Sequence, residues 1–189
     1  MNKTDIIFRK ADADDAGFIS KAMLAALGVG DFLSAPKKDL EVIEEIVKRN
    51  DTLYSYENVL VAEVDGKCAG CMIAYDGGRY PGMREVTFKL LKDELDMDYA
   101  QMPDETHEGE YYMDSLAVSP EFRKRGIGKS LMMKSLELGK SIGFTQASLL
   151  VLATDQGLQR LYKSCGFEPV GLQDCFGKKY LRMVASLKF

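Results

Sequence analysis

The sequence lacks several features that would assign it to particular classes of protein. No apolar run approaches the roughly 18 residues that a membrane-spanning helix needs. No internal repeat and no linker rich in Ser, Gly or Pro divides its 189 residues. With four cysteines and one histidine, the chain also has too few thiols for a disulfide scaffold of this length. These absences predict one domain that spans residues 1–189 and does not enter a membrane.

The chain also lacks an excess of positive charge. Lys and Arg number 25 against 29 Asp and Glu, which gives a net charge of −4. A chain of this sign has no overall field for holding nucleic acid or an anionic membrane surface, so neither is expected as a partner. Its first ten residues mix charges with a brief apolar run, unlike a signal peptide, and this favours a cytoplasmic location.

A metal centre is not expected either. Cys68 and Cys71 have the C-x-x-C spacing, but there is no second such pair, and Cys165 and Cys175 lie in different predicted elements. A thioredoxin-like site would need the first pair at the start of a helix, whereas residues 68–75 have the pattern of a strand. We therefore interpret these cysteines as small hydrophobic core residues.

Hydrophobic periodicity predicts strands interleaved with helices. Apolar runs at 58–64 and 68–75 are joined by Asp65 and Gly66, which is a strong signal of a β-hairpin. Further strands are expected at 6–9, 111–118, 146–152, 168–171 and 180–187, and helices at 18–27, 37–49, 84–95, 127–142 and 155–164. This order is typical of an α/β or α+β domain with a mixed sheet of about six to seven strands and about four to five helices.

One segment combines the features of a diphosphate-binding turn. Residues 116–130 read LAVSPEFRKRGIGKS, with a strand end, a Ser-Pro turn and a helix start that contains two glycines. Unpaired N–H groups at a helix N-terminus can bind a diphosphate, and glycines there let the ligand come close to the backbone. Four cations add to this, namely Arg123, Lys124, Arg125 and Lys129. Lys124 and Leu131 stand where the P-loop and the dinucleotide fingerprint need glycine, so the segment matches neither.

The basic turn alone is also compatible with a solvated loop, but its context resembles a known family. A strand followed by Leu-Ala-Val-x-Pro-x-x-Arg-x-x-Gly-x-Gly and a helix is similar to the coenzyme A segment of the GNAT superfamily of N-acetyltransferases. Residues 155–171, DQGLQRLYKSCGFEPVG, resemble a second family segment, a helix that ends in Leu-Tyr-x-x-x-Gly-Phe. The resemblance covers essentially the whole chain, with least support over residues 80–110, and implies a single GNAT-like domain.

The resemblance implies that acetyl-CoA is the co-substrate and indicates which residues bind it. In the family, a strand that opens at a bulge bonds the pantetheine arm through its backbone, here at Leu116, Ala117 and Val118. The diphosphate contacts, mostly from backbone N–H groups, would come from Arg123, Arg125, Gly126, Gly128 and Lys129. Asp155 stands where many members have Asn. Because an ionised Asp cannot donate a hydrogen bond, it either contacts the cofactor in another way or only caps its helix.

The resemblance also implies direct attack of a neutral amine on the acetyl thioester, without a covalent enzyme intermediate. Tyr162 falls where the family often has a tyrosine that donates a proton to the departing thiolate. A core role is the alternative, because Tyr162 shares a helical face with Leu158 and Leu161.

Two carboxylates are candidates for the base that takes the amine's proton. Glu110 lies seven residues before Ala117, where some members have a glutamate that acts in this way. Asp114 shares its strand face if no bulge intervenes. Either carboxylate could instead be structural, and His107 is a weaker candidate. Glu110 is our prediction for the base.

These observations predict an acetyl-CoA-dependent N-acetyltransferase that acts on a primary amine of a small molecule or peptide. Residues 93–110 carry eight acids and no Lys or Arg, so this segment would attract a cationic acceptor. A non-catalytic acyl-CoA-binding or regulatory domain with the same fold is the alternative. Members of the family often dimerise, so a homodimer is compatible with the sequence, which does not identify the acceptor.

Overall fold

A computed structural model describes residues 5–27 and 36–188, which fold around a seven-stranded mixed sheet. Its strand order is β1-β2-β3-β4-β5-β7-β6, and neighbouring strands are antiparallel except for β4 and β5. The strands are β1 (Ile7–Lys10), β2 (Val59–Val64), β3 (Lys67–Asp76), β4 (Tyr111–Val118), β5 (Gln146–Leu152), β6 (Glu168–Cys175) and β7 (Lys178–Ser186).

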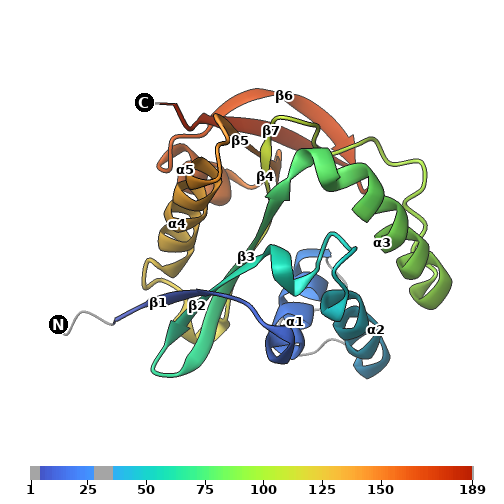
Figure 1. The fold of residues 1–189 in the computed structure, drawn as a ribbon. Coiled ribbons are helices and arrows are strands. Elements are labelled where there is room, and N and C mark those ends of the chain that lie inside the picture. The colour runs from blue at the N-terminus through green and yellow to red at the C-terminus, as the bar shows by residue number, and fades with distance from the viewer. Residues whose placement is uncertain (1–4, 28–35, 189) are drawn as a thin grey trace.

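Five α-helices in the described parts of the chain cover the sheet (Figure 1). They are α1 (Ala16–Leu27), α2 (Lys37–Lys48), α3 (Tyr80–Leu95), α4 (Ile127–Ser141) and α5 (Gln156–Lys163). Helices α1, α2 and α3 share one hydrophobic cluster with the sheet, and α4 lies on the other face with a second cluster. The predicted mixed sheet flanked by helices is confirmed.

The local sequence explains where the helices begin. A capping box formed by Asp12 and Asp15 precedes α1, and Pro81 occupies the first turn of α3. Helix α2 buries Ile43, Ile46 and Val47, which recur at helical spacing, while its other face is charged. Capping residues and helical periodicity therefore favour these three helices through the local sequence alone.

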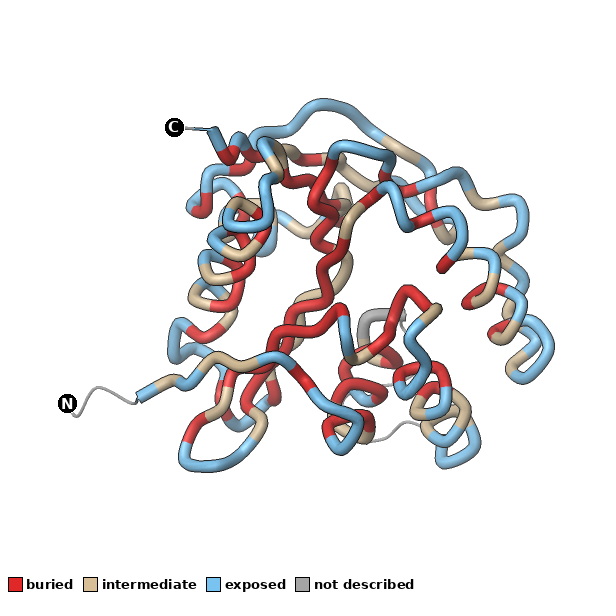
Figure 2. The backbone as a smooth tube through the Cα atoms, in the orientation of Figure 1, coloured by how far each residue is buried: buried red, intermediate tan, exposed pale blue. Residues whose placement is uncertain are grey.

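Strand β3 lies between the two cores. Its alternating side chains Cys71, Ile73 and Tyr75 belong to the cluster under α1 and α2, while Met72 and Ala74 belong to the cluster under α4. Figure 2 shows the buried stretch that runs along β3 and β4, in contrast to the exposed outer strand β6. Strand β4, next to this buried strand, is buried at Tyr111, Tyr112 and Met113 and partly exposed from Asp114 to Val118.

Of the two hairpin turns, the sequence predicts one and not the other. Asp65 and Gly66 join β2 and β3 with φ of 51° and 73°, and this predicted hairpin is confirmed. Strand β6 does not end at residue 171 as predicted but continues to Cys175. It turns into β7 through Phe176 and Gly177, with φ of 49° and 68°. Phenylalanine is unusual where such turns favour Asn, Asp or Gly, and this explains why sequence analysis missed the hairpin.

Strand β4 opens the sheet. It pairs with β3 along its length, but with β5 only at Tyr111 and Tyr112. A register shift against β3 leaves Asp114 as an extra residue in β4, which is a β-bulge. A bulge bends its strand and increases the local twist, so it accounts for the divergence of β4 from β5. The bulge lies at Asp114 itself, after the regularly paired residues Tyr111, Tyr112 and Met113.

Candidate active site

The divergence of β4 and β5 opens a cleft of about 220 Å³. Its walls come from β4, β5, α5, the turn between β6 and β7, and the acidic segment 93–110. Three lining residues are acidic, namely Glu105, Asp114 and Asp155. Convergence of acidic and aromatic side chains from distant parts of the sequence in one concave site is typical of a binding or catalytic site.

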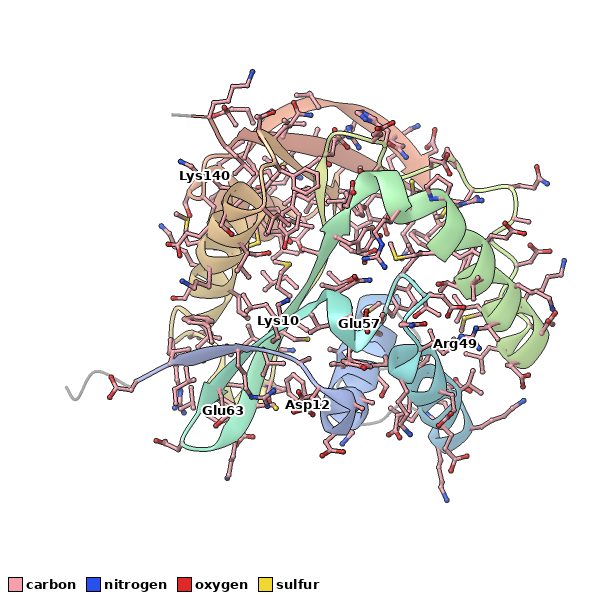
Figure 3. All side chains as sticks on the ribbon, viewed as in Figure 1. Lys10, Asp12, Arg49, Glu57, Glu63 and Lys140 are labelled. Carbon is pink, nitrogen blue, oxygen red and sulfur yellow. The ribbon has the colours of Figure 1, made fainter. Side chains whose placement is uncertain are left out.

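A second cavity, of about 230 Å³, lies on the α4 face of the sheet. Lys10 and Glu57, both labelled in Figure 3, are among its lining residues, together with apolar residues of β2, β3 and α4. The cleft between β4 and β5 holds two carboxyl groups, those of Glu105 and Asp114, whose pKa values are raised chiefly by burial. Perturbed acids gather at functional sites, so we take that cleft as the candidate active site.

Glu105 is the buried acid of the cleft, with 8% of its surface exposed. The Tyr112 hydroxyl donates a hydrogen bond to Glu105 Oε2 over 2.8 Å, and the Tyr80 hydroxyl lies 3.4 Å from Oε1. Burial, and then the nearby charge of Asp114, raise the pKa of Glu105 to about 8. Its carboxyl group can therefore exchange a proton near neutral pH.

Asp114, the bulged residue of β4, lines the same cleft. Its Oδ2 accepts a hydrogen bond of 2.6 Å from the Tyr75 hydroxyl, and its Oδ1 accepts one of 2.7 Å from Ser115 Oγ. Burial raises the pKa of Asp114 despite these two donors. Two hydroxyl groups fix its position, and the charge of Asp114 raises the pKa of Glu105.

Glu110, the predicted base, has its carboxylate fully engaged by protein donors. It forms an ion pair with Arg182 and accepts hydrogen bonds from Ser148 Oγ, Thr106 Oγ1 and Gln146 Nε2. Burial alone would raise its pKa, but these donors, led by Arg182, lower it. Glu110 does not line the cleft. Its contacts support a structural role, in which it ties the start of β4 to β5 and β7.

His107 stays on the surface. Its side chain is 70% exposed, and its Nε2 lies 3.4 Å from Glu110 Oε1. It is not among the residues that line the cleft. This position fits the sequence-based view of His107 as the weaker candidate.

Helix α5 brings Tyr162 and Asp155 to the wall of the cleft. Tyr162 is 8% exposed, and within residues 5–27 and 36–188 its hydroxyl makes no hydrogen bond. Burial raises its pKa to about 12, so the phenol is a neutral donor at physiological pH. Asp155 Oδ1 accepts a 2.9 Å hydrogen bond from the N–H of Leu158, so this side chain caps α5 as well as lining the cleft.

The turn before α4 carries unpaired backbone donors. Gly126 precedes the helix with φ of 81°, and Lys124 has φ of 62°. Among the described residues, the N–H groups of residues 124–129 have no acceptor. Arg123, Arg125 and Lys129 are exposed around them. Free N–H groups and cations at a helix N-terminus suit a diphosphate, so the turn fits the cofactor that the resemblance implies.

Two arginines of this turn also hold it in shape. Arg123 Nε donates to the Val118 carbonyl over 3.1 Å, and Arg125 Nη2 donates to the Glu121 carbonyl over 3.0 Å. The Arg125 guanidinium also lies 5.2 Å from the centre of the Phe122 ring. The backbone therefore supplies most of the free donors, while the two arginine side chains stabilise the turn and add charge.

Between the turn and the cleft runs the open edge of β4, with Leu116, Ala117 and Val118. Leu116 itself lines the cleft. Gly128 faces this edge, because a Cβ atom there would lie 3.6 Å from Val118 Cγ2 and 3.7 Å from Leu116 Cδ2. The cleft, the open edge and the turn therefore follow one another along the chain. The cleft borders β4 up to Leu116, the open edge runs from Leu116 to Val118, and the turn comes after the end of the strand.

Sequence analysis missed Glu105. The acidic segment was interpreted only through its negative charge, because nothing in the residues next to Glu105 indicates burial. Its hydrogen-bond partners Tyr80 and Tyr112 are 25 and 7 positions away. Asp114, in contrast, was already a candidate and lines the cleft.

Comparisons with known proteins agree with this geometry. The sequence model of the acetyltransferase (GNAT) family matches residues 29–167. The chain is similar to a crystal structure of an acetyltransferase, with a TM-score of 0.79, 24% identity, and coverage of 96% of this chain and 100% of that one. An N-acetyltransferase from Staphylococcus aureus gives a TM-score of 0.74 with 25% identity, covering 95% and 100%.

A third similar structure is the NatC complex bound to Gag peptide and CoA. It has a TM-score of 0.58 and 16% identity, and the match covers 97% of this chain and 99% of that one. No curated protein matches the chain. Within the described residues, no helix is both long and apolar enough to span a membrane, and no cluster of three or more potential ligands could hold a metal ion.

Proposed function

Because the chain belongs to the GNAT acetyltransferase family, we propose that it is an acetyl-CoA-dependent N-acetyltransferase that acetylates a primary amine. One observation carries the proposal. The cleft holds a buried carboxyl group whose pKa is about 8 and a phenol without a partner among the described residues, and both lie at the open edge of β4. A domain that only bound acyl-CoA would not need this pair of proton-exchanging groups.

Binding of acetyl-CoA is proposed along the open edge of β4. The N–H groups around Gly126 and Gly128, with Arg123, Arg125 and Lys129 nearby, would hold the diphosphate. Leu116, Ala117 and Val118 would hydrogen-bond the pantetheine arm through their backbone, as an added strand does. When bound, acetyl-CoA supplies the acetyl thioester. Asp155, which already caps α5, would border the cofactor without donating to it.

Glu105 is proposed as the base in place of Glu110. An amine reaches the enzyme mainly as its ammonium form and must lose a proton before it can attack. Ionised Glu105 can accept that proton, and a pKa near the working pH is the best match for this task. Asp114 is proposed as a positioning residue, because its charge raises the pKa of Glu105 and holds an ammonium group near it.

Tyr162 is proposed as the acid. Its hydroxyl has no hydrogen-bond partner among residues 5–27 and 36–188, its pKa of about 12 keeps it protonated, and Tyr162 lines the cleft together with Leu116. It can therefore donate a proton to the sulfur atom that leaves when the amine takes the acetyl group.

A cationic amine of a small molecule or peptide is the proposed acceptor. Three acidic side chains line the cleft, and the segment that supplies Glu105 carries eight acids without a Lys or Arg. A field of this sign attracts ammonium groups and repels carboxylates. The proposal includes residues 1–189 acting as one domain in the cytoplasm.

Release of free thiol from acetyl-CoA, measured with a panel of primary amines, tests the proposal. Thiol release should require an amine, and diamines should be used faster than neutral or acidic amino acids. The preference should weaken as salt is added, because salt screens the field of the cleft. Binding of acetyl-CoA without thiol release from any amine would instead favour a non-catalytic acyl-CoA-binding domain.

A further inference from the structure

The turn between β6 and β7 has an unusual residue at its first position. Phe176 has φ of 49°, and Gly177 follows with φ of 68°. Turns of this kind favour Asn, Asp or Gly at the first position, and a bulky residue with positive φ is strained there. The turn between β2 and β3 has the same positive φ values but carries Asp65 and Gly66, which such turns favour. Within this sheet, the unfavourable residue is therefore specific to the turn at Phe176.

Phe176 lies at the wall of the candidate active site. It lines the cleft beside Tyr180. Its ring lies edge-on to Tyr99, with 5.1 Å between ring centres and 82° between planes, and 6.3 Å from the Tyr180 ring. Aromatic contacts on two sides fix the orientation of the ring. Strained residues that the surrounding structure holds in place are characteristic of functional sites.

The lining of the cleft therefore combines two kinds of side chain. Glu105 and Asp114 are acidic and can receive an ammonium group, whereas Phe176 and Tyr180 present aromatic rings. A ligand that contacts both kinds carries its ammonium group on a hydrocarbon skeleton, because polar skeleton atoms would lose their hydrogen bonds to water against an aromatic ring.

We propose that Phe176 is a specificity-determining residue, whose ring forms the apolar wall of the acceptor subsite and selects amines with a hydrocarbon skeleton over equally charged amines with a polar one. This inference rests on the proposed function, since it takes the cleft to be the acceptor site. It narrows the acceptor to an alkyl or aralkyl primary amine.

The test compares two primary amines of equal charge and similar length, hexylamine and 2-(2-aminoethoxy)ethanol. For each amine we would measure the kcat/KM of thiol release and the affinity for the CoA-saturated protein by calorimetric titration. The wild-type protein should favour hexylamine by roughly tenfold or more. In Phe176→Asn, which suits the turn but lacks the apolar ring, the preference should fall roughly tenfold. Phe176→Leu should retain most of it.

Tyr99→Ala is the matched control. It removes the same aromatic contact from the turn, but Tyr99 does not line the cleft. A purely structural role for Phe176 predicts equal losses for both amines in Phe176→Asn and in Tyr99→Ala, and that result would overturn the inference. So would a wild-type protein that binds neither amine or does not distinguish them. If the binding preference shifts as expected but no thiol is released, the inference stands and the catalytic proposal fails.

Discussion

At the scale of single residues, two glutamates from one acidic segment have opposite environments. Glu105 faces two tyrosine hydroxyls in a buried cleft, and burial raises its pKa to about 8. Glu110, five residues later, pairs with Arg182, and its pKa is lowered. A carboxylate with a lowered pKa is a poor proton acceptor, whereas one near 8 is well matched to an amine.

Glu105→Gln should lower kcat/KM for acetyl transfer by roughly a hundredfold. Because a carboxyl group accepts a proton only when ionised, wild-type activity should rise with pH and level off above about 8. The activity of the variant should depend on pH only through deprotonation of the acceptor's ammonium group. Steady-state rates of thiol release across the pH range measure both effects.

Glu108→Gln is the control for this prediction, because it removes one acid from the same segment at an exposed position. It should leave the pH profile unchanged. An identical profile in the wild-type protein and in Glu105→Gln would remove Glu105 from the mechanism.

Tyr162→Phe should lower kcat by at least about tenfold and leave KM nearly unchanged, because a leaving-group proton matters only in the transition state. The hydroxyl has no partner among the described residues, so its removal should not destabilise the fold. Tyr111→Phe, which removes a buried hydroxyl that faces Ser135 and α4, should not affect turnover. Unchanged turnover in Tyr162→Phe would make Tyr162 a core residue only.

At the scale of elements, local patterns predicted most of the secondary structure. The hairpin at Asp65 and Gly66, the buried face of α2 and the start of α4 at Ile127 each follow from residues close together in sequence. The hairpin at Phe176 did not, because its first residue contradicts the usual turn preference. The bulge at Asp114 depends on pairing with β3, which a single strand sequence does not encode.

The turn before α4 gives a prediction about cofactor binding. Gly128→Ala should weaken acetyl-CoA binding by roughly tenfold, or about 1.4 kcal/mol, because the added methyl lies over the edge that the cofactor would follow. The fold should be unaffected, since the new Cβ would be at ordinary contact distance from Val118 and Leu116. Calorimetric titration measures the affinity.

Gly82→Ala makes the same change in the first turn of α3, where a Cβ meets open space. It should bind acetyl-CoA as the wild-type protein does. Equal affinity in all three proteins would show that the cofactor does not pass Gly128.

The contact between Glu110 and Arg182 joins β4 to β7 and gives a prediction about stability. Glu110→Gln should lower the free energy of unfolding by about 3 kcal/mol, because it leaves a half-buried arginine without its charge partner. Since folding lowers the pKa of Glu110, its stabilising effect is present above the ordinary value of 4.5 and is lost as the pH falls through the folded value.

Urea unfolding of the wild-type protein and of Glu110→Gln should therefore show a difference that shrinks in acid. Glu41→Gln, on the exposed face of α2, serves as the control and should change stability little. Lost turnover with unchanged stability in Glu110→Gln would return Glu110 to the role of base.

At the scale of the whole molecule, one departure from regular pairing creates the site. Strands β4 and β5 pair at only two positions and then diverge. The gap gathers Glu105, Asp114 and Tyr162 from three separate parts of the chain. The family resemblance indicated the opened edge and Tyr162 in advance. It could not indicate Glu105, because the resemblance has the least support over residues 80–110 and the burial of Glu105 depends on distant tyrosines.

The structure of the chain with acetyl-CoA bound is the most direct test of the proposed site. We expect the diphosphate to accept hydrogen bonds from N–H groups within residues 124–129 and the pantetheine arm to follow Leu116, Ala117 and Val118. The thioester should then end between Tyr162 and Glu105. A complex with the diphosphate elsewhere, or with the thioester outside the cleft between β4 and β5, would contradict the proposed mechanism.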